Sequence, residues 1–150
     1  MPIKALIAGV ALLAASGVAF ADLDPWKDYD ISESVWSVTT VKVHSNMGDA
    51  YLEGLRETWI PGNKISQELG QIESWKIYRS DLEASGDFNV LLVVKFANTQ
   101  DLAPNKANYE KFMAKFTKEQ ADRTSEYAQK NYPAMRDITG VYLMREITIK

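Results

Sequence analysis

The stretch that decides the fold is Val35-Trp-Ser-Val-Thr-Thr-Val-Lys-Val-His-Ser45. It is rich in β-branched residues, which favour a pleated strand over a helix. Alternation with a period of two places Trp36 and Val38 on one face, and Val41 and Val43 on the other. Because both faces carry apolar side chains, we expect the sheet that contains this strand to be covered on both sides.

The elements after this strand are predicted from hydrophobic period and from breakers. A helix is expected over 49–69, with a kink or break at Pro61 because proline lacks the backbone donor. Its second piece, 63–69, should end at Gly70. Strands are expected over 72–79, 88–96 and 140–149, and the first two are joined by a polar loop over 80–87.

A second helix is expected to begin near Lys106, since Tyr109, Phe112, Met113 and Phe116 form an apolar stripe. A more polar continuation reaches about Asn131, either as the same helix or as a separate one over the domain edge. Pro133 is expected to close it.

Before the first strand, two segments are expected to lie outside the domain. Residues 1–21 combine a basic start, an apolar run and the small-x-small triplet Ala19-Phe-Ala21, which is the pattern of a signal peptide. The protein is therefore predicted to be periplasmic or secreted, with no membrane attachment after cleavage. Residues 22–34 read as an extended acidic arm, and residues 35–150 as one domain.

The order strand–helix–strand–strand–helix–strand predicts an α+β, ferredoxin-like fold with an antiparallel sheet. Two right-handed crossovers place both helices on one face of that sheet. The other face would then expose a large apolar surface, which monomers rarely do. The economical arrangement is a homodimer packed sheet to sheet, which makes a dimeric α+β barrel.

Composition limits the chemistry. The 150 residues include no cysteine, so disulfides, thiolate catalysis and cysteine metal sites are absent. The net charge is −3, with basic and acidic residues interspersed, which argues against nucleic acid as a partner. A single histidine without a second nitrogen or sulfur ligand does not make a typical transition-metal site, so no metal or other cofactor is expected.

Residues 35–149 resemble the dimeric α+β-barrel superfamily. The resemblance rests on Val41-Lys-Val-His-Ser-Asn-Met-Gly-Asp-Ala-Tyr51, on the helix Tyr51-Leu-Glu-Gly-Leu-Arg-Glu-Thr-Trp59, and on Ser74-Trp-Lys-Ile-Tyr78 before an apolar strand. The chain looks most similar to exported, uncharacterised members, and the superfamily that it resembles includes antibiotic-biosynthesis-type monooxygenases. The resemblance implies the fold, whereas members range from enzymes to proteins without known activity.

Three residues are candidates for chemistry. His44 titrates near neutral pH and is the candidate general base, or else it only caps a turn. Tyr78 and Arg145 are candidates to stabilise an enolate or phenolate. Arg145 interrupts an apolar strand, so it is expected to pair with Glu57, across a dimer, or with a ligand carboxylate.

Large aromatic residues form the second set of candidates. They either line a pocket for an apolar or aromatic ligand or fill the core and the dimer interface. The ligand-binding candidates are Trp36, Tyr51, Trp59, Trp75, Phe112 and Tyr142.

Three hypotheses for function follow. The first is a homodimeric module that binds a small ligand or has a structural role. The second is a cofactor-independent monooxygenase or isomerase that acts on an aromatic or polyketide-like substrate. The third is a partner-binding protein whose acidic arm, residues 22–34, engages another chain. A cavity of about 300 Å3 between sheet and helices with His44 in its wall would favour the enzyme.

Overall fold

The structure is a computed structural model that describes residues 22–82 and 85–150. The predicted signal peptide, residues 1–21, lies outside the described residues and stays a prediction. Six strands are present in the described part: β1 (Tyr29–Ile31), β2 (Val35–Val43), β3 (Ser74–Arg79), β4 (Val90–Phe96), β5 (Arg136–Met144) and β6 (Ile147–Ile149). The helices there are α1 (Gly48–Glu57), α2 (Trp59–Glu68), the short 3-10 helix η1 (Thr99–Leu102), α3 (Lys106–Lys115) and α4 (Lys118–Met135).

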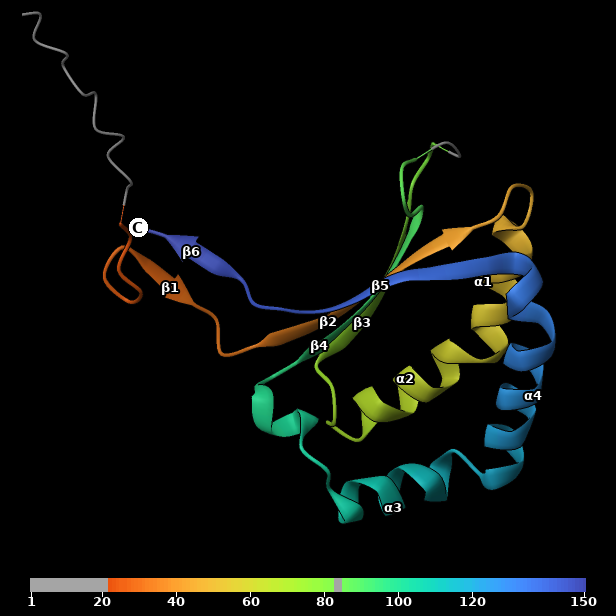
Figure 1. Ribbon diagram of the computed structural model, residues 1–150. Helices are drawn as coiled ribbons and strands as arrows, with labels where there is room; N and C mark the ends of the chain where they lie inside the picture. Colours follow the sequence, from red (N-terminus) through yellow and green to blue (C-terminus); the bar gives the residue numbers. More distant parts are fainter. Residues whose placement is uncertain (1–21, 83–84) are drawn as a thin grey trace, which may run out of the picture.

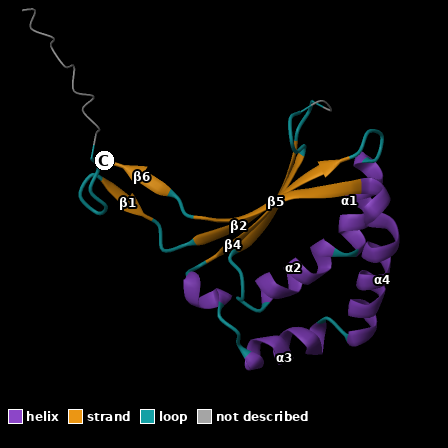
Figure 2. Ribbon diagram, in the orientation of Figure 1, coloured by secondary structure: helices purple, strands orange, loops and turns teal. Residues whose placement is uncertain are grey.

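The main sheet has the order β3-β4-β2-β5, and every neighbouring pair is antiparallel. Counted along the chain from β2, this order is that of a ferredoxin-like fold, with the first and third strands in the middle. The helices lie on one side of the sheet (Figures 1 and 2). The predicted fold class is confirmed, and the apolar stretch from Val35 to Val43 is a central strand.

The first helix breaks earlier than predicted. The break falls at Thr58, not at Pro61, and Thr58 closes α1 with its backbone N–H and its hydroxyl both donating to the carbonyl of Gly54. Pro61 is then the third residue of α2, where a backbone donor has no acceptor within the helix. Because the helix is broken at Thr58, the ring of Pro61 has no preceding helical turn to clash with.

Two predictions near the C-terminus are wrong in detail. Pro133 does not close the helix but lies within the last turn of α4, two residues before its end at Met135. The last strand begins at Arg136 and not at Gly140, because the ladder with β2 continues past a register shift and pairs Arg136 with Val43 and Asp137 with Lys42. The strand is also divided at Arg145, into β5 and β6.

The main core lies between the helices and the sheet. Val41, Val90 and Leu92 point from β2 and β4 toward Tyr51 and Leu55 of α1. Tyr132 of α4 joins them and meets Tyr51 edge-to-face, with ring centroids 5.4 Å apart. Helix α1 presents these residues because positions four apart share one helix face.

The opposite face of the sheet has no helix on it in the described part of the chain (Figure 1). Residues directly opposite each other in a ladder share a face of the sheet. Val38 and Leu91 have the opposite parity to the core residues Val41 and Leu92, so they and the residues opposite them point to the bare face. Its apolar members are Trp36, Val38, Tyr78, Leu91, Val93, Tyr142 and Met144. Tyr78, Tyr142 and Met144 are each more than half exposed.

The predicted acidic arm contains a strand. β1 pairs antiparallel with β6, so that both ends of the described chain form a two-stranded ribbon that projects from the sheet (Figure 1). Trp26, at the tip of the ribbon, is 63% exposed and adopts a left-handed backbone conformation with φ of 69°.

Candidate functional site

His44 follows β2, beside the start of β5 and the end of α4. Its Nε2 lies 2.9 Å from a carboxylate oxygen of Asp137, and its Nδ1 lies 3.1 Å from the carbonyl oxygen of Ala134. Both oxygens are acceptors, so the imidazolium form, which donates from both ring nitrogens, is the form that satisfies both contacts. The hydrogen bond to Asp137, followed by that to Ala134, raises the pKa of His44. Held in this way, His44 has no free nitrogen to act as a general base.

The paired histidine makes stability depend on pH. Because the pKa of His44 is raised on folding, its contribution is fully present below the unfolded pKa of about 6.5 and is lost as pH rises through the folded pKa. We expect the free energy of unfolding of the natural protein, relative to a His44→Gln variant, to fall from pH 6 to pH 9. Urea titrations at each pH measure this difference. An Asp137→Asn variant should flatten the profile, and a difference that grows with pH would contradict the assignment.

The three candidates for chemistry do not meet within one protomer. Val43, next to His44, pairs with Arg136, whereas Trp36, at the other end of β2, pairs with Met144, next to Arg145. Seven residues of strand, at about 3.3 Å each, separate His44 from Arg145 by roughly 23 Å. Tyr78 is on the bare face of edge strand β3 and is 52% exposed. The described protomer therefore assembles no catalytic trio from His44, Tyr78 and Arg145.

Arg145 has a partner of another kind than predicted. Its Nη1 donates to the carbonyl oxygens of Ser32 and Glu33, at 2.9 and 2.8 Å, and its Nη2 donates to the hydroxyl of Thr99. No carboxylate of the described residues, Glu57 included, pairs with it. Arg145 thus ties the base of the β1–β6 ribbon to η1, which is a structural role.

The six aromatic candidates divide among several places. Tyr51 is fully buried in the core, where burial raises the pKa of its phenol to about 12. Trp59 and Trp75 meet edge-to-face 5.6 Å apart, and Phe112 packs on Phe116 at 5.2 Å. The remaining two, Trp36 and Tyr142, are on the bare face. Rings therefore fill the space beside α1, and the six do not line one pocket.

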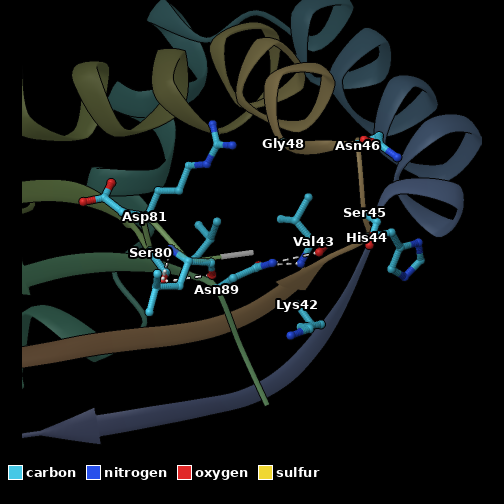
Figure 3. A pocket seen from close by; sticks show the side chains of 12 residues that line it. Lys42, Val43, His44, Ser45, Asn46, Gly48, Ser80, Asp81 and Asn89 are labelled. Carbon is cyan, nitrogen blue, oxygen red and sulfur yellow. Dashed lines mark hydrogen bonds between the residues drawn. The ribbon is translucent and has the colours of Figure 1, made fainter. Parts of the chain in front are cut away.

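A cavity of about 500 Å3 lies where β2 ends and the β3–β4 connection begins (Figure 3), and we name it the strand-end cavity. Its lining includes Lys42, Val43, His44, Ser45, Asn46, Gly48, Arg79, Ser80, Asp81, Leu82, Asn89 and Val90. The His44 side chain lies beside Ser45 and away from Ser80, Asp81 and Asn89 (Figure 3). His44 thus borders a cavity between the ends of β2, β3 and β4 and the start of α1, but both of its ring nitrogens are engaged by Asp137 and Ala134.

The polar groups of the strand-end cavity are largely engaged within the protein. The Asn89 side chain accepts from the N–H of Val43 at 2.7 Å and donates to its carbonyl at 2.9 Å, as a peptide group of a strand would. Lys42 Nζ donates to the carbonyls of Ser85 and Gly86. Arg79 pairs with Asp49 at 3.2 Å. These bonds hold the β3–β4 connection against β2, so this cavity offers few groups to a ligand.

A second cavity, of about 330 Å3, lies between the sheet, α2 and the start of α3. We name it the amide cavity, because four carboxamides line it. Its lining comprises Asn63, Gln71, Asn105 and Asn108, the hydroxyls of Ser37 and Ser66, the carboxylate of Asp101, and apolar Ile72, Val94, Phe96 and Ala103. This position, between sheet and helices, is the one expected for a ligand, although His44 is not in its wall.

The amides of this cavity are only half engaged. Asn63 uses its NH2 group on the carbonyl of Trp59, and Gln71 uses its NH2 group on the carbonyl of Asn108, both at 2.8 Å. Asn105 uses its Oδ1 to accept the N–H of Asn108 at 3.0 Å, as the cap of α3. The side chains of Asn108, Ser37 and Ser66 bond to no other described residue. Oxygens, NH2 groups and hydroxyls thus remain unpaired around one cavity.

Sequence reasoning missed this set. The residues come from β2, α2, the segment before β3, η1 and α3, and each of them alone is an ordinary surface polar residue. One signal was present in the sequence. Ser37 is a polar residue within the apolar strand β2, Ser66 is a polar residue within α2, and Asn105 and Asn108 lie at the N-terminus of α3. Only the fold brings them together.

Other kinds of site find no support in the described residues. Within 22–82 and 85–150, no group of three or more His, Asp or Glu side chains is placed to hold a metal ion. None of the helices in that part combines the length and the apolar character that crossing a membrane requires.

No protein-family model matches the chain, and no curated protein matches it. Solved structures do resemble it. Protein SO0527 from Shewanella oneidensis is 16% identical, with a TM-score of 0.49 over 81% of this chain and 99% of that one. HapK from Hahella chejuensis is 12% identical, with a TM-score of 0.44 over 75% and 91%. A dimeric protein of unknown function with a ferredoxin-like fold from Bacteroides fragilis is 10% identical, with a TM-score of 0.42 over 78% and 98%.

The fold assignment rests on this chain's own topology. The strand order β3-β4-β2-β5, with the helices on one face and the bare face opposite, defines a ferredoxin-like fold. This matches the resemblance seen in residues 35–149.

Proposed function

We propose that the protein is an exported, homodimeric module that binds a small ligand in the amide cavity. The observation that carries this proposal is the set of unpaired amide and hydroxyl groups around a cavity of about 330 Å3. These groups are partly buried or, at Asn105, exposed, so water satisfies them in the free protein and a ligand with suitable polar groups can replace that water. The size lies at the lower end of the range for small-molecule sites, about 300–1,000 Å3.

Binding is better supported than catalysis. The monooxygenase or isomerase hypothesis needs His44 as a base, and both ring nitrogens of His44 are engaged by acceptors of the protein itself, Asp137 and the carbonyl of Ala134. It also needs Tyr78 or Arg145 at the reacting group, and these residues lie on the bare face and at the ribbon base. An apolar aromatic ligand, moreover, fits an amide-lined cavity poorly, because it leaves the amides without partners.

The homodimer is supported by the bare face. Its seven apolar residues form one continuous patch over four strands, and water contact with such a patch is unfavourable. A second copy related by a two-fold axis covers both patches at once. The amide cavity opens on the helix side of the sheet, so dimerisation leaves it accessible.

Export is supported by the sequence of residues 1–21 alone. Extraction of the natural protein from the periplasm or the culture medium, with the mature N-terminus at Asp22, is the expected result.

Native mass spectrometry of protein taken from its own host tests the binding role. We expect an adduct of small mass on the natural protein and loss of that adduct in an Asn108→Ala, Ser66→Ala double variant. Asn131→Ala, Ser125→Ala is the matched control on α4 and should keep the adduct. A natural protein that carries no adduct, and that no small molecule of a broad library stabilises against heating, would overturn the proposal.

A further inference from the structure

The lining of the amide cavity restricts the charge of a ligand. It contains no Lys, Arg or His among the described residues that line it, and its single ionisable group is the Asp101 carboxylate. One oxygen of Asp101 accepts the N–H of Asn98. An anionic ligand would lose its hydration and gain no cation in return, and it would lie beside a carboxylate. A neutral ligand has neither cost.

The unpaired groups also restrict the chemistry of a ligand. The acceptors are the amide oxygens of Asn63 and Gln71, and the donors are the NH2 groups of Asn105 and Asn108. Such a mixture suits a ligand whose groups both donate and accept. Hydroxyl groups do this, and a carboxamide binds two adjacent hydroxyls with its oxygen and its NH2 group together.

The cavity also has an apolar side. Val94 and Phe96 come from β4, and Ile72, only 8% exposed, comes from the segment before β3. The C–H groups of a sugar or polyol ring can pack on such side chains while its hydroxyls meet the amides. A volume of about 330 Å3 holds one such ring with its hydroxyls.

We infer that the amide cavity binds a neutral, hydroxyl-rich ligand of the size of one sugar ring. This inference rests on the proposed function, and it adds the class of ligand. Asn108 and Ser66 supply bonds that no other part of the described chain uses, and the half-engaged amides of Asn63 and Gln71 are held in place by their bonds to backbone carbonyls.

Titration of the full-length mature protein with single compounds tests the inference. The probes are D-glucose, D-galactose, D-mannose, D-ribose and myo-inositol, with benzoate, putrescine and phenol as the anionic, cationic and aromatic comparisons. Calorimetry and ligand-observed NMR are the readouts. We expect saturable binding of at least one of the five polyols, and no saturable binding of benzoate, putrescine or phenol.

Variants locate the site. Asn108→Ala and Ser66→Ala each remove one hydrogen-bonding group from a helix and should weaken polyol binding by about 3- to 10-fold. Alanine is the best helix former, so both variants should stay folded. Asn131→Ala and Ser125→Ala, the controls on α4, should bind as the natural protein does. Polyol binding that neither cavity variant alters would overturn the inference.

The outcomes separate the inference from the proposed function. Binding of benzoate, putrescine or phenol alone, weakened by Asn108→Ala, would overturn the ligand class and leave the binding role intact. Binding of none of the probes, together with the absence of any adduct from the host, would overturn both.

Discussion

A Tyr78→Asp, Tyr142→Asp double variant should be monomeric at concentrations at which we expect the natural protein to be a dimer. The two tyrosines lie on the edge strands β3 and β5 of the bare face, and each is 52% exposed in the protomer. Across a two-fold axis every substitution enters the interface twice. Four carboxylates would then replace tyrosine rings in the interface and have to be desolvated, so the dissociation constant should rise by at least about 100-fold. Sedimentation velocity measures the change.

Tyr109→Asp is the matched control for dimerisation. Tyr109 is 63% exposed on α3, on the helix side of the sheet, so the same substitution there should leave the dimer intact. Circular dichroism should show that all variants are folded, because the substituted side chains are outside the core. A natural protein that sediments as a stable monomer at micromolar concentration would contradict the dimer.

Tyr51→Ala should lower the free energy of unfolding by about 3–5 kcal/mol, the cost of truncating a large buried ring. Tyr51 is fully buried, and it contacts the core residues of β2 and the ring of Tyr132. Urea unfolding at one fixed protein concentration measures the difference in the free energy of unfolding between the variant and the natural protein. The slope of that free energy against urea concentration should not change if the folded and unfolded states stay as compact as before.

A pair of Tyr→Phe variants separates the ring from the hydroxyl. The Tyr51 hydroxyl is buried and has no hydrogen-bond partner among the described residues, so Tyr51→Phe should stabilise the protein by about 1 kcal/mol. Tyr132 shares a hydrogen bond with the Thr58 hydroxyl, so Tyr132→Phe should destabilise it by a similar amount. If both substitutions stabilised the protein, or both destabilised it, this assignment of the two hydroxyls would be contradicted.

The fold was predictable from the sequence because its signals are local. The alternation in Val35–Val43 and the apolar run of Val90–Val94 predict strands, and the stripe of Phe112, Met113 and Phe116 predicts a helix. The element order then leaves few topologies. The predicted end of α2 is confirmed as well: Gly70 has φ of 68°, and the N–H groups of Gly70 and Gln71 bond to the carbonyls of Gln67 and Ser66.

Boundaries that depend on partners far along the chain were not predictable. The break at Thr58 depends on its hydroxyl, which bonds both to Gly54 and to Tyr132, 74 residues away. The start of β5 at Arg136 depends on the pairing of Arg136 with Val43 in the ladder and on the bond between Asp137 and His44. No periodicity in a short window contains these contacts.

The candidate site shows the same division more sharply. His44 was the obvious residue because it is the single histidine of the chain, yet its environment decides its chemistry: two acceptors engage its ring nitrogens and raise its pKa. Asn63, Gln71 and Asn108 drew no attention, since isolated amides are common on surfaces. Their importance comes from a shared cavity and from hydrogen bonds that they leave unmade.

The sequence by itself determined the class of fold, the order of its elements and the two-sided apolar character of the sheet, because those depend on period, breakers and β-branching along short stretches. The tertiary structure decided which polar groups are paired and which surround a cavity, because hydrogen-bond satisfaction is set by neighbours that are distant along the chain. The stretch Val35–Val43 illustrates both: its pattern made it a central strand, and only the packed helices make Val41 core, Val38 bare face and Ser37 the wall of a site.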